Sequence, residues 1–116
     1  MPLNTIGSEA EDRALQYLQR QGLRLLERNY RTRRGEIDLI MLEGKVRVFV
    51  EVRFRRSASH GGAVASITPA KQRRIALAAL QHLQASKAGE MPCRFDVVAV
   101  GPAEFEWIRG AFESPL

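Results

Sequence analysis

Two neighbouring segments of the chain share an unusual pattern of apolar and charged positions. Residues 48–54 are apolar at five of seven positions, and the exceptions are Glu51 and Arg53. Residues 36–41 alternate between acidic and apolar side chains over their first four positions. Both patterns are typical of β-strands. Because successive side chains of a strand point to opposite faces, Glu51 and Arg53 are expected on the same face, about 6–7 Å apart.

A hairpin would bring the charged positions of the two segments together. Residues 36–41 are expected to have one apolar face, made of Ile37, Leu39 and Met41. The opposite face carries Asp38. Residues 42–45 contain Gly44 and are typical of a short turn between antiparallel strands. We therefore expect Asp38, Glu51 and Arg53 to meet on one face of a sheet.

The remaining periodicity predicts two helices and three further strands. In chain order these are a helix at 8–21, a strand at 23–30, the two segments above, a helix at 69–85, and strands at 94–100 and 105–108. Thr68 is expected to cap the second helix, with Pro69 at its first position. This helix is long enough to cross over and place 94–100 parallel to a neighbouring strand. The prediction is an α/β domain with a mixed five-stranded sheet flanked by helices.

Four polar residues outside the two charged strands have competing interpretations. Glu11 follows Ser8 by three residues, as in a capping box, or it reaches the carboxylates from the first helix. Asp96 is either a charge on a strand edge or a polar group tied to the same site. His82 is expected to be a partly exposed helix residue, and His60 a solvated residue of a loop at 57–66.

The length of 116 residues fits one domain, spanning 1–116, with one modest core. Hydrophobic residues at 45% and charged residues at 27% are ordinary for a globular protein, but a net charge of +5 and a pI near 10.1 are not. Ten of the 18 basic residues form three clusters: Arg28, Arg31, Arg33 and Arg34; Arg53, Arg55 and Arg56; and Lys71, Arg73 and Arg74. They are interpreted either as a phosphate-binding surface or as a solvated basic face. An anionic membrane is disfavoured, because no apolar helix face accompanies the basic residues.

Cysteine usage and hydropathy exclude several classes. The single Cys93 rules out an internal disulfide and a cysteine-based metal site. No run of 18 apolar residues is present, and Glu9, Glu11 and Asp12 interrupt any signal-peptide core. We expect a cytoplasmic protein.

The paired carboxylates favour divalent metal chemistry. A carboxylate taken out of water costs several kcal/mol unless it is paired, hydrogen-bonded or metal-bound. Asp38 and Glu51 would repel each other, and Mg²⁺ prefers oxygen ligands, usually taking one or two from the protein. The alternative is an ordinary salt-bridged strand face in contact with solvent.

Taken in order, these segments resemble the YraN-like family of small bacterial proteins. That family lies within the PD-(D/E)xK, or restriction-endonuclease-like, nuclease superfamily and is similar to archaeal Holliday junction resolvases. The resemblance covers nearly the whole chain and implies a restriction-endonuclease-like core. It rests on Gly7, Glu11, Asn29, Tyr30, residues 35–40, residues 49–53, Lys71, Arg74, Ile75 and residues 94–98.

The resemblance implies roles for individual residues. Asp38 and Glu51 would be ligands of Mg²⁺ or Mn²⁺, with the Val52 carbonyl and the helix-borne acid Glu11 as further candidates. Arg53 stands where the superfamily usually has lysine. Because arginine does not deprotonate in proteins, Arg53 would hold the phosphate, and would not act as a base.

The expected function is a metal-dependent endonuclease that hydrolyses phosphodiester bonds in structured or branched DNA. The alternative is a non-catalytic nucleic-acid-binding protein with a nuclease-like fold, and a third interpretation is a protein-interaction adaptor. A junction substrate would favour a homodimer. The expected nucleic-acid contacts are Arg31, Arg33, Arg34, Arg55, Arg56, Lys71 and Arg74.

Overall fold

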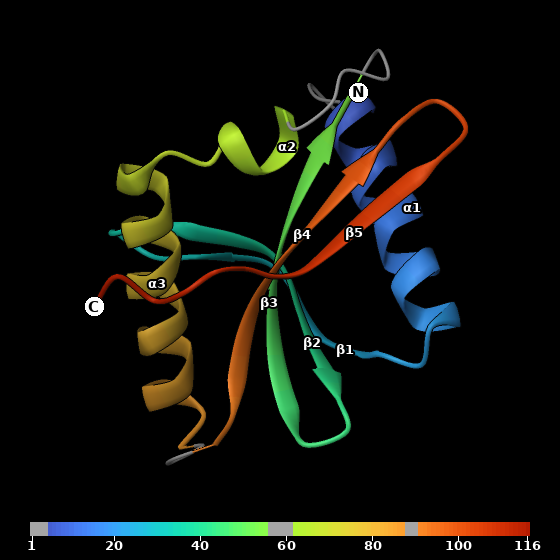
Figure 1. The fold of residues 1–116 in the computed structure, drawn as a ribbon. Helices are drawn as coiled ribbons and strands as arrows, with labels where there is room; N and C mark the ends of the chain where they lie inside the picture. The colour runs from blue at the N-terminus through green and yellow to red at the C-terminus, as the bar shows by residue number, and fades with distance from the viewer. Residues whose placement is uncertain (1–4, 56–61, 88–90) are drawn as a thin grey trace.

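The computed structural model describes residues 5–55, 62–87 and 91–116. The elements are α1 (Thr5–Arg20), β1 (Arg24–Arg31), β2 (Glu36–Glu43), β3 (Val46–Phe54), α2 (Gly62–Ala65), α3 (Pro69–Ala85), β4 (Cys93–Val100) and β5 (Phe105–Phe112) (Figure 1). Arg56 and His60 lie outside the described residues. The short α2 falls in the region expected to be a loop.

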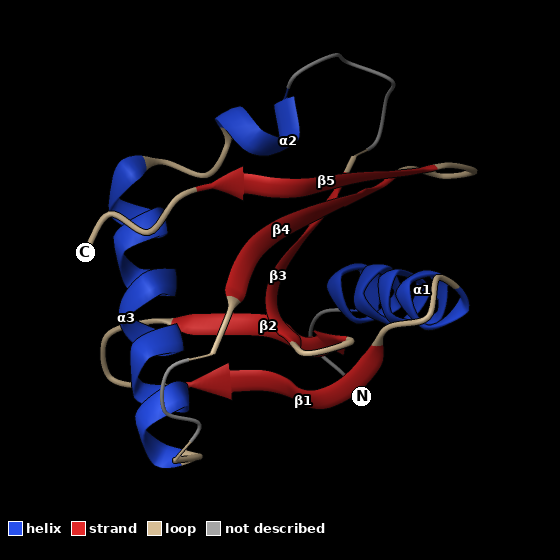
Figure 2. Ribbon diagram, turned by 60° about the horizontal axis from the view of Figure 1, so that its bottom comes forward, coloured by secondary structure: helices blue, strands red, loops and turns tan. Residues whose placement is uncertain are grey.

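The strands form a five-stranded sheet in the order β1-β2-β3-β4-β5. The β1–β2, β2–β3 and β4–β5 pairs are antiparallel, whereas β3 and β4 are parallel. The parallel pair is joined through α3, which crosses from one strand to the next. Figure 2 shows α1 and α3 on opposite faces of the sheet. The predicted mixed α/β sheet with flanking helices is confirmed.

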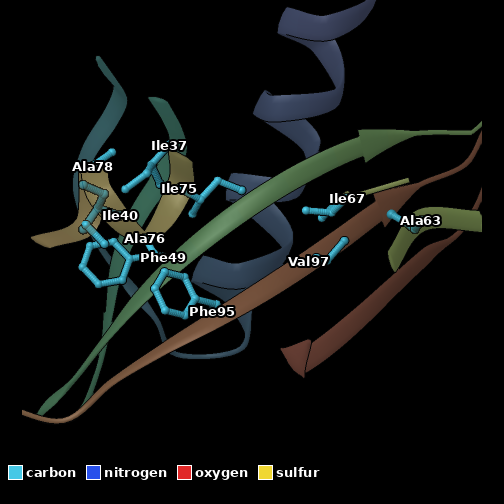
Figure 3. Packing of buried hydrophobic residues seen from close by; sticks show 12 residues of the cluster. Ile37, Ile40, Phe49, Ala63, Ile67, Ile75, Ala76, Ala78, Phe95 and Val97 are labelled. Atoms are coloured by element: carbon cyan, nitrogen blue, oxygen red, sulfur yellow. The ribbon is translucent and has the colours of Figure 1, made fainter. Parts of the chain in front are cut away.

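Each face of the sheet has its own hydrophobic cluster. On the α3 face, Phe49 packs with Phe95, their ring centroids 5.6 Å apart, and with residues of α3 (Figure 3). On the α1 face, Val48 and Val50 pack with residues of α1 such as Leu18. Because β3 and β4 are covered on both sides, they are nearly continuous apolar runs, as is usual for parallel strands.

The predicted start of α3 is confirmed. Thr68 is the N-cap residue and its hydroxyl accepts a hydrogen bond from the Lys71 N–H at 3.2 Å, while Pro69 occupies the first helical turn. The capping box predicted for the first helix is wrong, because α1 already includes Thr5 and Ser8 therefore lies inside it.

The predicted apolar face of β2 is also wrong. Ile37 packs in the α3-side cluster, whereas Leu39 and Met41 pack in the α1-side cluster. The change of face occurs where the pairing of β2 with β3 ends, beyond Leu39↔Val50.

His82 is buried, which contradicts the expected partial exposure. Its ring meets the Tyr30 ring edge-on at 4.9 Å, and its Nδ1 accepts a hydrogen bond from Arg47 Nη1 at 3.2 Å. Its Nε2 lies 3.4 Å from a carboxylate oxygen of Glu27. Residues of β1 and β3 therefore cover this part of α3 and provide polar partners for the imidazole.

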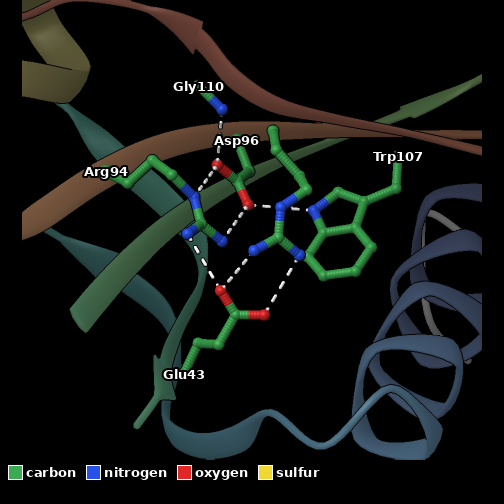
Figure 4. A network of polar contacts seen from close by, with 6 residues as sticks. Glu43, Arg94, Asp96, Trp107 and Gly110 are labelled. Atoms are coloured by element: carbon green, nitrogen blue, oxygen red, sulfur yellow. Dashed lines mark hydrogen bonds and ion pairs between the residues drawn. The ribbon is translucent and has the colours of Figure 1, made fainter. Parts of the chain in front are cut away.

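Asp96 fits neither of its two interpretations. It is 1% exposed in β4, which has paired strands on both sides, so it is not on a sheet edge. It also does not line the cleft described below. Its carboxylate accepts hydrogen bonds from Arg94, Trp107 and the Gly110 N–H (Figure 4). The last strand extends to Phe112, beyond the expected end at residue 108, and supplies two of these donors.

Candidate functional site

The candidate site lies where β2 and β3 separate. Their pairing runs from Glu43↔Val46 to Leu39↔Val50. The next residue of β2, Asp38, instead accepts a hydrogen bond from the Val52 N–H with its side chain, at 2.8 Å from Oδ2. A side-chain carboxylate thus takes a donor that a strand partner would otherwise satisfy, and Asp38 is held against residues 51–53.

A cleft of about 580 Å³ opens at this point, between the N-terminal part of α3 and the middle of α1. Four acidic residues line it: Glu11, Glu36, Asp38 and Glu51. Six basic residues line it as well: Arg31, Arg33, Arg34, Arg53, Lys71 and Arg74. Val52 is also part of the wall. The structure therefore brings together all the residues predicted as catalytic or as metal ligands.

Of the predicted nucleic-acid contacts that the structure describes, one is not part of this cleft. Arg55 does not line it, and its Nη2 lies 3.5 Å from Glu106 Oε1 on β5. Arg56 lies outside the described residues. The other five predicted contacts line the cleft together.

Where β2 and β3 separate, Asp38 affects the ionisation of Glu51. Burial raises the pKa of Glu51 well above its usual range, and hydrogen bonding to Asp38 and the charge of Asp38 raise it further. The charges of Arg53 and Lys71 act in the opposite direction. Either protonation of Glu51 or a cation beside it would relieve the repulsion between the two carboxylates.

Glu11 approaches the same pair from α1. Burial raises its pKa, and the charge of Asp38 is the next largest cause. Arg28 opposes both effects, with its Nη2 3.6 Å from Glu11 Oε1. This agrees with the interpretation in which Glu11 faces the carboxylates from the helix.

Arg53 lies on the same face as Glu51, as the alternation of β3 predicted. Its Nη2 is 3.3 Å from Glu51 Oε2. The buried Nε of Arg53 has no hydrogen-bond partner among the described residues, as is also true of Arg28 and Arg47 away from the cleft. Buried donors are normally satisfied, so Arg53 retains capacity for an additional acceptor inside the cleft.

The turn between β1 and β2 is held in a fixed shape by Thr32 and Gly35, of which Thr32 was not among the predicted site residues. The Thr32 hydroxyl accepts hydrogen bonds from the N–H groups of Arg34 and Gly35, each at 3.1 Å, and donates to the Gly35 carbonyl at 2.9 Å. A Cβ on Gly35 would overlap the carbonyl of Arg74, lying 2.7 Å from its carbon. Glycine thus lets the turn pack directly against α3. The signal in the sequence was a Thr followed three residues later by Gly, which is weak without knowledge of α3.

The donor set suits a hard divalent cation. In the described parts of the chain, no group of three or more His, Cys, Asp or Glu residues is arranged to hold a metal ion. Mg²⁺ commonly binds through one or two carboxylates and keeps several waters, so it does not need an all-protein cage. Asp38 and Glu51 fit this requirement by number and chemistry, and a cation between them would relieve their mutual repulsion.

Within residues 5–55, 62–87 and 91–116, no helix has the length and apolar character needed to cross a membrane.

Comparison with known proteins identifies the family. The model of the family described as "Uncharacterised protein family UPF0102" matches residues 10–100. The UPF0102 protein of Herminiimonas arsenicoxydans is 53% identical over 111 residues, covering 94% of this chain and 87% of the relative. Those of Cupriavidus pinatubonensis and Saccharophagus degradans are 55% and 52% identical, covering 92% and 94% of this chain and 84% and 93% of the relatives. The family resemblance seen in the sequence is confirmed at this level, and the chain belongs to the UPF0102 family.

Proposed function

We propose that this protein is a Mg²⁺- or Mn²⁺-dependent nuclease that hydrolyses phosphodiester bonds in structured or branched DNA. We also propose that its sheet is the core of a restriction-endonuclease-like fold of the PD-(D/E)xK superfamily. One observation carries the proposal: Asp38 and Glu51 converge at the fork between β2 and β3, inside a cleft with six cationic side chains. Acidic residues in a basic cleft are the arrangement that a metal ion and a polyanion require together.

In this proposal Asp38 and Glu51 would hold the metal ion. When bound, such an ion lowers the pKa of its water and offsets charge on the phosphoryl oxygens. Arg53 would bind the scissile phosphate through the donors that Glu51 does not use. It would not accept a proton, because the guanidinium stays charged in proteins.

The rim of the cleft would bind the rest of the backbone. Arg33 and Arg34 are carried by the turn that Thr32 holds in shape, and Lys71 and Arg74 come from α3. Contacts of this kind position a nucleic acid without reading its bases and weaken steeply with salt.

A non-catalytic nucleic-acid-binding protein is the second candidate. It is favoured by the Arg53–Glu51 contact of 3.3 Å, which places a permanent cation beside a candidate ligand. It predicts binding that depends on salt but is indifferent to divalent metal and to the charge of Asp38.

Cleavage assays with two matched variants separate these candidates. Asp38→Asn removes the charge but keeps an oxygen that can accept the Val52 N–H. Asp12→Asn is the same chemical change on the exposed face of α1, outside the cleft. Wild type and both variants would be incubated with labelled single-stranded, duplex, flap and four-way-junction DNA, each with EDTA, Mg²⁺ or Mn²⁺.

If the protein is a nuclease, wild type and Asp12→Asn should cleave DNA in the presence of the metal ion, and Asp38→Asn should not. Cleavage that persists in Asp38→Asn would refute the assignment of the site. Equal binding by all three proteins without cleavage would favour the second candidate.

A further inference from the structure

Phe54 differs from the other aromatic residues of the chain. Seven of the eight aromatic side chains pair with another aromatic or histidine ring: Tyr17, Tyr30, Phe49, Phe95, Phe105, Trp107 and Phe112. Within the described residues Phe54 has no such partner and belongs to neither hydrophobic cluster. It is 40% exposed. Packing of the core therefore does not explain a large flat side chain at this position.

Phe54 lies in the wall of the cleft. It is the last residue of β3, next to Arg53, and it pairs with Val100 of β4. The described part of the chain has four exposed large hydrophobic residues, namely Leu26, Phe54, Leu80 and Leu116. Of these, Phe54 alone lines the cleft, where it shares the wall with six cationic side chains.

A cationic cleft with a flat apolar side chain in its wall suits a polynucleotide, which has anionic phosphates and flat bases. The cations bind phosphate, and an exposed aromatic ring offers a stacking surface for a base. In a continuous duplex both faces of each base are covered by its neighbours, so only an unpaired or extruded base has a face to offer. The two features together favour a polynucleotide with unpaired bases over an intact duplex.

We propose that Phe54 stacks on an unpaired nucleobase of a strand whose backbone lies against the cationic side chains of the cleft, so that the cleft takes nucleic acid with unpaired nucleotides at this point. This inference rests on the proposed function, because it assumes that the cleft binds a nucleic-acid backbone. It narrows the substrate class from structured DNA to DNA whose strand is single or opened where it meets β3.

Binding measurements with two substitutions of Phe54 test the inference. Phe54→Leu keeps apolar volume but loses the flat ring, whereas Phe54→Trp keeps a stacking surface. Leu80→Ala removes another exposed apolar side chain, from the part of α3 outside the cleft, and Arg34→Gln removes one cation of the cleft. Fluorescence anisotropy would measure affinity for oligodeoxythymidine and for a duplex of equal length, with Ca²⁺ replacing Mg²⁺ to limit hydrolysis.

We expect Phe54→Leu to weaken binding of the single strand by about 5- to 150-fold, the usual range for one base–aromatic stack. Duplex affinity should not change, Phe54→Trp should retain single-strand binding, and Leu80→Ala should behave as wild type. Arg34→Gln should weaken both ligands alike, because backbone contacts do not distinguish unpaired from paired bases.

The outcomes separate the two proposals. If Arg34→Gln weakens both ligands but Phe54→Leu changes neither, or changes both equally, the stacking inference is wrong and the nucleic-acid cleft stands. If wild type binds neither ligand at low salt with Ca²⁺, the proposed function fails and the inference falls with it.

Discussion

The buried carboxylate of Asp96 is expected to be the most sensitive polar group in this fold. Its side chain is fully buried, and each oxygen accepts two hydrogen bonds. Oδ1 accepts from Arg94 Nε at 2.8 Å and from the Gly110 N–H at 3.0 Å. Oδ2 accepts from Arg94 Nη2 and Trp107 Nε1, both at 2.9 Å. Asp96 thus joins β4 to β5 at two points.

The substitution Asp96→Asn shows how much this network contributes to the free energy of unfolding. The amide has one acceptor oxygen, and its NH₂ group would face two donors, so two of the four hydrogen bonds are lost. Hydrogen bonds to charged groups contribute about 1.5–3 kcal/mol each, and breaking a buried ion pair costs about 3–5 kcal/mol. Arg94 keeps its contact with Glu43 at 2.9 Å, which limits the penalty on the arginine side. We expect the free energy of unfolding to fall by about 3–5 kcal/mol.

Urea denaturation followed by circular dichroism measures this loss. Asp12→Asn is the matched control, since Asp12 forms an exposed ion pair with Arg28 at 2.8 Å, and such pairs contribute about 0–1 kcal/mol. The reasoning would be refuted if Asp96→Asn unfolded within about 1 kcal/mol of wild type with an unchanged dependence on urea.

Three further predictions concern the cleft and the buried histidine. Gly35→Ala should cost about 1–3 kcal/mol of stability by overlap with the backbone of α3, and should weaken nucleic-acid binding by displacing Arg34; urea denaturation and anisotropy test the two effects. Burial lowers the pKa of His82 below its ordinary 6.5, so stability should be full above that pH and fall as pH drops through the lowered pKa; in His82→Gln, urea midpoints should lose this decline. The pKa of Glu51 is raised above 4.5, so the metal-free protein should lose stability as pH rises from that value towards the raised pKa. Glu51→Gln should abolish this loss together with any rise in melting temperature on adding Mg²⁺.

The parts of the fold that could be predicted are those fixed by local pattern. Continuous apolar runs located β3 and β4, and Thr68 followed by Pro69 located the start of α3. Alternation along β3 was sufficient to place Arg53 beside Glu51. These features depend on neighbours close in sequence, which is why the pattern determines them.

The residues that were wrongly predicted depend on contacts distant in sequence. The burial of His82 depends on Tyr30 and Arg47, and the role of Asp96 depends on Trp107 and on Gly110, which lies beyond the predicted end of β5. Local polarity carries no information about such partners. A polar residue therefore has the same sequence signature whether the fold exposes it or satisfies it inside.

The contrast between the Asp96 network and the Asp38–Glu51 pair supports the proposal that the cleft binds a ligand. Structural ion pairs also perturb pKa values, so a raised pKa alone does not identify a binding site. Asp96 is fully buried, but both its oxygens are saturated by donors of the protein, and such a group has nothing left to offer a ligand. Glu51 is also largely buried, but it faces another carboxylate and a single cation at 3.3 Å, and that cation has an unused buried donor. A charge left incompletely compensated in a cleft costs stability, and a ligand that completes the compensation recovers it.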